Sequence, residues 1–191
     1  LPTRATDCTR GRGRRAWGTG RRRLIYYLGL GSNLGRRAAN LARARRRLER
    51  GGVAVVRASP VYETEPVGFA DQPPFLNQVL EVRSELDPPA LLRLAKSIEA
   101  ALKRTPALPN GPRTIDIDIL LAGDLVTRGP DPVVPHSRMH LRNFVRGPLE
   151  DIAPDLRHPV LGRTVRELRA ACPDRSRVER FARARRARPR D

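Results

Sequence analysis

The chain has few cysteines and no long apolar segment. Its 191 residues include two cysteines, Cys8 and Cys172, which are too few and too far apart for a disulfide framework or a zinc site. We therefore expect a reducing, cytoplasmic environment. No apolar run approaches the roughly 18 residues that a membrane-spanning helix needs, so we expect no membrane association.

Lysine is also scarce, because Lys96 and Lys103 stand beside 36 arginines in a chain of formal net charge +18. Such a charge suggests a nucleic-acid-binding module, but a binding face usually mixes both basic residues. The charge is also concentrated at the ends. Residues 1–23 carry eight Arg and one Asp, and residues 175–191 carry eight Arg and two acids.

Both ends lack hydrophobic periodicity, so we expect a disordered basic leader at 1–23 and a disordered basic tail at 175–191. One domain would occupy residues 24–174. The leader is Arg-rich and almost free of acids, as organelle transit peptides are. Gly and Pro interrupt any amphipathic helix there, so an unstructured leader or a start site assigned too early are the alternatives.

Hydrophobic patterns predict strands at residues 24–30, 53–58, 75–82 and within 111–121, with 61–62 continuing the second strand. Helices are predicted at 36–50, at 88–104 with Asp87 as N-cap, and at 165–171. Residues 144–145 form only a short apolar piece. The order strand, helix, strand, strand, helix, strand indicates an α+β fold, a ferredoxin-like α/β/α sandwich with a mainly antiparallel sheet.

The last of these strands carries two carboxylates, Asp116 and Asp118. Residues two apart in a strand point to one face, while Ile115 and Ile117 point to the other. A hard cation relieves the repulsion between such carboxylates, and Mg2+ commonly uses one or two of them plus substrate phosphates. Arg113, just upstream, suits phosphate. The alternative is a solvated strand face, although like charges side by side are destabilising.

Six motifs, in order, make the chain similar to the 6-hydroxymethyl-7,8-dihydropterin pyrophosphokinase family. They are residues 30–35, 59–68, 72–77, 98–99, 111–121 and 134–136, and the resemblance covers about residues 24–171. It implies transfer of pyrophosphate from ATP to the pterin hydroxymethyl group in folate biosynthesis, with release of AMP. It also implies two Mg2+ ions, ATP as co-substrate and mobile loops.

The same resemblance implies roles for individual residues. Asp116 and Asp118 would bind the metal, and three arginines would be catalytic: Arg104, Arg113 and Arg142. The nucleotide site would comprise Glu99, Arg104, Arg113, Ile119, His136 and Arg142. The pterin slot would comprise Thr64, Glu65, Val67, Phe75, Asn77 and Phe144. Phe75 and Phe144 would sandwich the ring, Asn77 would face its edge, and Ser32 and Asn33 would support the pocket.

Simpler interpretations stand beside these roles. A surface arginine is normally solvated, His136 follows Pro135 as a turn residue would, and Glu99 could belong to a surface ion-pair stripe with Lys96 and Lys103. The glycine-rich stretch at 31–35 could cradle phosphate, but it fits neither common phosphate-loop pattern.

The chain departs from the family pattern after the long helix. Residues 103–106 read KRTP where relatives often have Gly-Arg-x-Arg, so Pro106 replaces the second arginine. Glu65 and Asn110 also differ from many relatives. The alternatives to the pyrophosphokinase are another ATP-Mg transferase on the same fold and a basic nucleic-acid-binding module. The expected partners are ATP and a reduced pterin, with no specific nucleic acid. A monomer and association with other folate-pathway enzymes are also expected.

Overall fold

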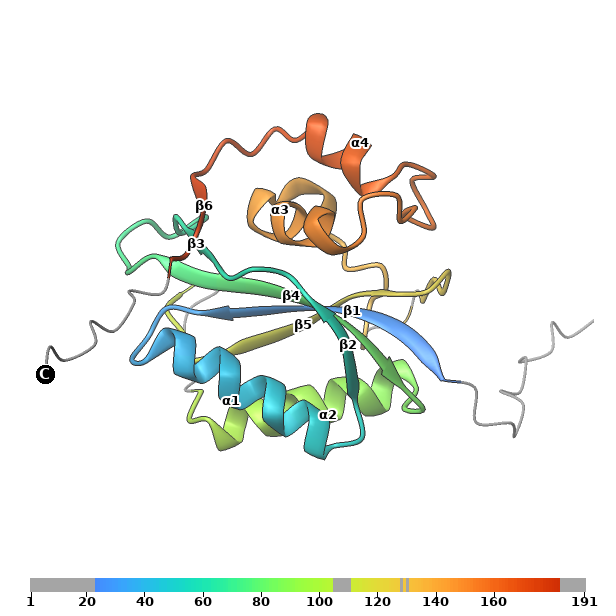
Figure 1. Ribbon diagram of the computed structural model, residues 1–191, viewed down its shortest axis with the longest axis horizontal. Helices are drawn as coiled ribbons and strands as arrows, with labels where there is room; N and C mark the ends of the chain where they lie inside the picture. The colour runs from blue at the N-terminus through green and yellow to red at the C-terminus, as the bar shows by residue number, and fades with distance from the viewer. Residues whose placement is uncertain (1–22, 105–110, 128, 130, 183–191) are drawn as a thin grey trace, which may run out of the picture.

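The computed structural model describes residues 23–104, 111–127, 129 and 131–182. Figure 1 shows a mixed α/β arrangement in which helices cover both faces of one sheet. The elements are, in order, β1 (Leu24–Ser32), α1 (Arg37–Arg50), β2 (Ala54–Ala58), β3 (Tyr62–Thr64), β4 (Phe75–Ser84), α2 (Pro88–Ala101), β5 (Asp116–Ala122), a 3-10 turn η1 (Met139–Leu141), α3 (Asn143–Ile152), α4 (Val165–Ala170) and β6 (Val178–Arg180).

The sheet has six strands in the order β5-β1-β4-β3-β6, and β2 also pairs with β4. Every pair of these strands is antiparallel. The pairing of β1 with both β4 and β5 is the split β-α-β arrangement that the order of elements predicts. The expected ferredoxin-like fold is therefore confirmed.

Each face of the sheet has its own hydrophobic core, because side chains alternate along a strand. Tyr26 and Leu28 of β1 pack with Leu41 of α1 and Leu91 of α2. Tyr27, on the opposite face, packs with residues of α3 and α4 such as Leu149. In Figure 1, α1 and α2 lie below the sheet, and α3 and α4 lie above it.

Helix α3 is missing from the sequence prediction, which has only a short apolar piece at residues 144–145. Gly147 and Pro148 interrupt the helical signal, and no capping side chain precedes the helix. The helix forms nonetheless, because Val145, Leu149 and Ile152 lie at helical spacing and are buried in the second core.

Helix α2 begins as predicted, with the Asp87 carboxylate accepting a hydrogen bond from Ala90 N at 2.8 Å. It ends at Ala101 rather than near residue 104. Lys103 has a φ of 60°, which ends the helix, because side-chain-bearing residues rarely adopt the left-handed conformation inside one.

The predicted disorder of residues 175–191 is wrong for Val178–Arg180, which pair as β6 with β3. A three-residue, charge-rich edge strand has almost no local signal, since its partner lies far away in sequence. Residues 1–22, most of the predicted leader, and residues 183–191 lie outside the described part of the chain. Among the described residues, no helix has both the length and the apolar character to cross a membrane.

Candidate functional site

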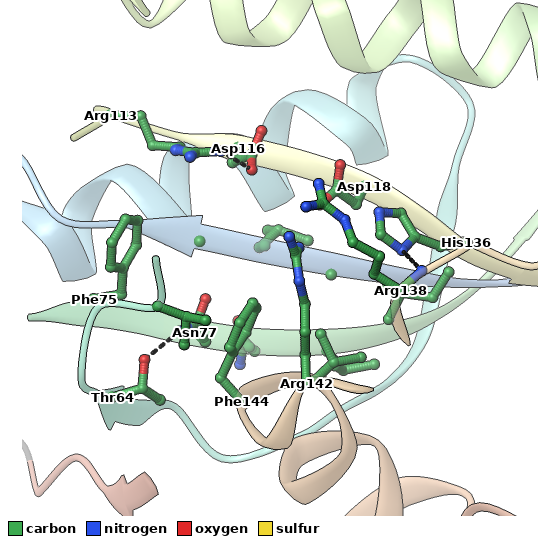
Figure 2. A pocket seen from close by; sticks show the side chains of 18 of the residues that line it. Thr64, Phe75, Asn77, Arg113, Asp116, Asp118, His136, Arg138, Arg142 and Phe144 are labelled. Carbon is green, nitrogen blue, oxygen red and sulfur yellow. Dashed lines mark hydrogen bonds and ion pairs between the residues drawn. The ribbon is translucent and has the colours of Figure 1, made fainter. Parts of the chain in front are cut away.

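A cavity of about 640 Å³ opens on the α3 side of the sheet. Strands β1, β3, β4 and β5 contribute to it, together with the end of α2 and the start of α3 (Figure 2). A volume of this order suits a small-molecule site. The predicted site residues that line it are Thr64, Glu65, Val67, Phe75, Asn77, Glu99, Arg104, Arg113, Asp116, Asp118, His136, Arg142 and Phe144.

Ile119 is the predicted nucleotide contact that the structure does not bring to the cavity. Its side chain is 4% exposed and belongs to the core beneath α1 and α2. Because neighbouring residues of a strand point to opposite faces, Ile119 has to face away when Asp118 faces the cavity.

Two glycines keep the floor of the cavity open. Gly29 pairs with Asp118 and Gly31 pairs with Asp116, so both lie on the strand next to the carboxylates. A Cβ atom at Gly31 would come within 2.9 Å of Asn77 Oδ1. Glycine at this position therefore lets the acidic strand β5 and the Asn77 side chain of β4 share one cavity.

Asp116 and Asp118 lie on the same face of β5, as predicted, while Ile115 and Ile117 are fully buried on the other. Burial and the charge of Asp116 raise the pKa of Asp118 to about 6. The raised pKa means that the charged form of Asp118 is disfavoured, and a bound cation would favour it again. The described residues hold no group of three or more His, Cys, Asp or Glu side chains placed for a metal.

Asp116 is paired with two arginines. Its Oδ2 atom lies 2.6 Å from Arg113 Nη1, and its Oδ1 atom lies 2.8 Å from Arg104 Nη1. The side chains of Arg104 and Arg113 are only 26% and 18% exposed. They are therefore not the solvated surface arginines of the simpler interpretation.

The loop after β1 holds Arg113 in place. The backbone N–H groups of Asn33 and Leu34 donate to Arg113 O, and Asn33 Oδ1 accepts from Arg113 N at 2.7 Å. Ser32 Oγ donates to Thr114 O at 2.6 Å. Since these amides bind the chain itself, the loop supports the pocket, as expected of Ser32 and Asn33, and does not cradle phosphate.

Glu99 is buried, which argues against the alternative interpretation of a surface ion-pair stripe. Its Oε1 atom accepts a hydrogen bond from Ile117 N at 2.8 Å, which ties α2 to β5. Lys96 and Arg104 form ion pairs with the same carboxylate, whose side chain is 4% exposed. Lys103 lies beyond the end of the helix.

His136, Arg138 and Arg142 are basic residues whose side chains point toward the Asp118 end of the cavity (Figure 2). Burial lowers the pKa of Arg142, and the nearby Arg138 lowers it further. Burial and these two arginines also lower the pKa of His136, so its ring is neutral at pH 7, and its Nδ1 accepts from Arg138 N at 3.2 Å. The sequence analysis missed Arg138, because nothing local distinguishes it from the other arginines.

The opposite end of the cavity is apolar with one polar edge. Asn77 lies between Phe75 and Phe144 in Figure 2, and its Nδ2 donates to Thr64 Oγ1 at 2.7 Å. The guanidinium of Arg113 lies 5.9 Å from the centre of the Phe75 ring. That of Arg142 lies 5.4 Å from the centre of the Phe144 ring. A flat ligand between the two rings would meet the Asn77 amide at its edge.

Comparison with known sequences finds close relatives over most of the chain. The chain is 44% identical over 148 residues to a 2-amino-4-hydroxy-6-hydroxymethyldihydropteridine pyrophosphokinase of Pseudomonas aeruginosa, covering 77% of this chain and 91% of the relative. It is 43% identical over 129 residues to the enzyme of that name from Bacillus subtilis, covering 67% and 77%.

Longer relatives match as well. The folic acid synthesis protein fol1 of Pneumocystis carinii is 40% identical over 139 residues, or 73% of this chain. The chain spans only about a fifth of that protein and of its Schizosaccharomyces pombe counterpart, 19% and 20% of their lengths.

Solved structures share the fold. The wild-type HPPK-DHPS structure of Plasmodium falciparum superposes with a TM-score of 0.63 at 18% identity, over 78% of this chain and 44% of the other. The family model described as 7,8-dihydro-6-hydroxymethylpterin-pyrophosphokinase (HPPK) matches residues 27–154, which include every residue identified above in the cavity. The chain therefore belongs to the 7,8-dihydro-6-hydroxymethylpterin-pyrophosphokinase family.

Proposed function

We propose that this chain transfers a pyrophosphoryl group from ATP to the hydroxymethyl group of 6-hydroxymethyl-7,8-dihydropterin and releases AMP, in folate biosynthesis. The observation that carries the proposal is the division of one cavity into two chemically distinct ends. One end holds carboxylates and arginines, and the other holds an aromatic slot with an amide edge. These ends match a metal-bound triphosphate and a pterin ring.

In this reaction the hydroxymethyl oxygen attacks the β-phosphorus of ATP. The bond between the β-phosphorus and the oxygen that bridges to the α-phosphorus breaks, and that oxygen leaves with AMP. The hydroxyl proton passes to solvent, since the transfer depends on positioning and charge more than on a covalent intermediate. Arg104, Arg113 and Arg142 bind phosphate oxygens and oppose the charge that develops on them.

Asp116 and Asp118 are the residues that would hold two Mg2+ ions, which neutralise phosphate charge and orient the β-phosphorus when bound. Mg2+ commonly combines one or two carboxylates with substrate phosphates, which fits the pair of carboxylates that β5 presents to the cavity. Arg104 and Arg113 form ion pairs with Asp116. On nucleotide binding these arginines exchange the carboxylate for phosphate oxygens.

The remaining residues position the substrates. Glu99 and the neutral His136 lie on the nucleotide side, and Arg138 adds positive charge there. Thr64, Phe75, Asn77 and Phe144 bind the pterin, while Glu65 and Val67 lie at the exposed rim. Ile119 does not share the nucleotide site through its side chain.

The test is AMP release from ATP, Mg2+ and the dihydropterin. We expect release by the intact chain and loss of more than a hundredfold in Asp116→Ala and in Asp118→Ala, as for removal of key electrostatic groups. Asp155→Ala is the matched control, because Asp155 is 86% exposed and is not among the residues that line the cavity. Well-folded protein that releases no AMP would refute the proposal.

Neither a different ATP-Mg transferase nor a nucleic-acid-binding module gains support from the site. The Pro106 substitution lies in residues 105–110, outside the described chain. The cytoplasmic location, the monomeric state and association with other folate enzymes stay predictions.

A further inference from the structure

Residues 171–182, which we name the C-terminal strap, follow α4 and include β6. They lie beyond residue 154, where the family match ends. In Figure 1 the strap runs over α3 and enters β6 beside β3. Helix α3 and strand β3 each carry a residue that lines the cavity, Phe144 on α3 and Thr64 on β3.

The first attachment of the strap is at the start of α3. Asp174 Oδ2 accepts a hydrogen bond from Asn143 N at 2.8 Å, and Ser176 O accepts from Asn143 Nδ2 at 3.2 Å. Arg142, the residue at the N-cap position, provides no side-chain cap. Asp174 therefore caps α3 from a distance, as an acceptor at a helix start should. The capped residue stands between Arg142 and Phe144.

The carboxylate of Asp174 also interacts favourably with the buried guanidinium of Arg146, one turn further along α3. Arg146 is 1% exposed; its Nη1 donates to Leu168 O, whereas Nε and Nη2 have no hydrogen-bond partner among the described residues. Burial lowers the pKa of Arg146, and the charge of Asp174 acts in the opposite direction. Burial would raise the pKa of Asp174, but hydrogen bonds from Asn143 and Ser176 lower it below its ordinary value. Asp174 is therefore ionised at neutral pH.

The second attachment is at β3. Val178 pairs with Thr64 in the sheet. Beyond the strand, Glu65 N donates to Arg177 O at 3.2 Å and Arg177 N donates to Glu65 Oε2 at 3.1 Å. The pairing with the strap thus reaches the rim of the cavity.

A cluster of three side chains joins the strap, β3 and α3. Tyr62 of β3 donates its hydroxyl to Asp151 of α3. Arg180 of β6 donates to Tyr62 Oη at 3.2 Å and to Asp151 Oδ1 at 3.0 Å. The strap therefore contacts α3 near both ends of that helix, at Asn143 and at Asp151.

We propose that the C-terminal strap positions the pterin side of the cavity, with Asp174 as its main positioning residue. The proposal rests on the proposed function, since it concerns how the same site holds the acceptor. The strap fixes Phe144 through the start of α3 and Thr64 through β3. Among the described residues, the strap makes no such contact with Arg104, Arg113 or Asp116. The ion pairs of these three residues run to Glu99 of α2 and to one another, and Arg113 N also donates to Asn33 in the loop after β1.

The test compares Asp174→Ala with the unchanged chain. Binding of 6-hydroxymethylpterin is followed by its fluorescence with Mg2+ and a non-hydrolysable ATP analogue present, and binding of the analogue is measured separately by calorimetry. Loss of a cap, about 1 kcal/mol, corresponds to a rise of about fivefold in the pterin Kd. We expect the Kd of the analogue to change by less than twofold, and the KM for the dihydropterin to rise with little change in kcat.

Two further variants distinguish positioning from simple loss of stability. Asp174→Asn keeps an oxygen acceptor for Asn143 N and should retain pterin affinity within twofold. Asp155→Ala is the matched control, since Asp155 is 86% exposed and pairs with the exposed Arg166 of α4 at 3.5 Å; neither Kd should change. Circular dichroism and thermal unfolding establish that each variant is folded.

Equal loss of pterin and nucleotide binding in folded Asp174→Ala, or unchanged pterin binding, would overturn the proposal. If Asp174→Ala does not fold, Arg180→Ala tests the proposal instead, because Arg180 is 68% exposed and its loss leaves the Asp174 cap in place. Unchanged pterin binding in Arg180→Ala would contradict the strap's role. Failure of the unchanged chain to bind pterin or to release AMP would instead refute the proposed function.

Discussion

Asp118 is the residue at which stability and the proposed function oppose each other. Its pKa is raised from 3.8 to about 6, first by burial and then by the charge of Asp116. Well below pH 3.8 both the folded and the unfolded chain hold the proton, so the folded state carries no penalty. As pH rises toward 6 the unfolded chain loses the proton first, and above pH 6 the full cost of the buried charge lowers stability.

We therefore predict that Asp118→Asn raises the free energy of unfolding by about 1–3 kcal/mol at pH 8 and by about 0.5 kcal/mol or less at pH 4, while AMP release is lost. Urea unfolding in EDTA-containing buffer at the two pH values measures the difference. Asp124→Asn, at an exposed position just after β5, is the control and should alter neither value. A loss of stability at pH 8 would contradict this account of the buried carboxylate.

Glu99 has a structural role besides its place in the site. Its carboxylate is buried, accepts the Ile117 N–H and pairs with Lys96 and Arg104. Removing it leaves a buried N–H without its acceptor and a partly buried guanidinium without one of its partners. We predict that Glu99→Ala lowers the free energy of unfolding by about 2–4 kcal/mol.

Chemical denaturation without ligands measures that loss. Glu49→Ala is the matched control, because the exposed Arg45–Glu49 pair on α1 should contribute about 0.5 kcal/mol or less. Equal, small effects of the two substitutions would show that Glu99 acts only as a ligand contact.

At the scale of elements, local capping sets where α2 begins. Asp87 accepts from Ala90 N, and Pro88 and Pro89 open the helix. We predict that Asp87→Ala costs about 1 kcal/mol, which lowers Tm by about 2–4 °C in a chain of this size. Asp87→Asn, which preserves the cap, should retain Tm within about 1 °C. The KM values should not change, because Asp87 lies outside the cavity; a large change in KM would link the start of α2 to the site.

The elements that the sequence predicted well are those with strong local signals. Asp87 with its prolines marks α2, and the alternating Ile and Asp residues mark β5 together with the two faces of that strand. Helix α3 and strand β6 escaped prediction because tertiary contacts form them. Asp174, 31 residues away, caps α3, and β6 exists only through pairing with β3.

At the scale of the whole molecule, the motifs predicted a site whose parts come from distant segments, and the fold brings them to one cavity. Ile119 is the predicted site residue whose side chain does not reach the cavity. Side chains alternate along β5, so Ile119 faces the core, and the motif resemblance took no account of this alternation. Arg138 escaped because its role depends on the turn that places it beside His136 and Arg142. The pairing of Asp116 with two arginines likewise depends on the loop after β1, which is far from β5 in sequence.

The central claim is that this cavity transfers pyrophosphate and not a single phosphate. Phosphorus NMR of the products formed from ATP, Mg2+ and 6-hydroxymethyl-7,8-dihydropterin tests it most directly. The account predicts one AMP for each pterin diphosphate formed and no ADP. Accumulation of ADP with a pterin monophosphate, or AMP formed with free pyrophosphate and unmodified pterin, would contradict it.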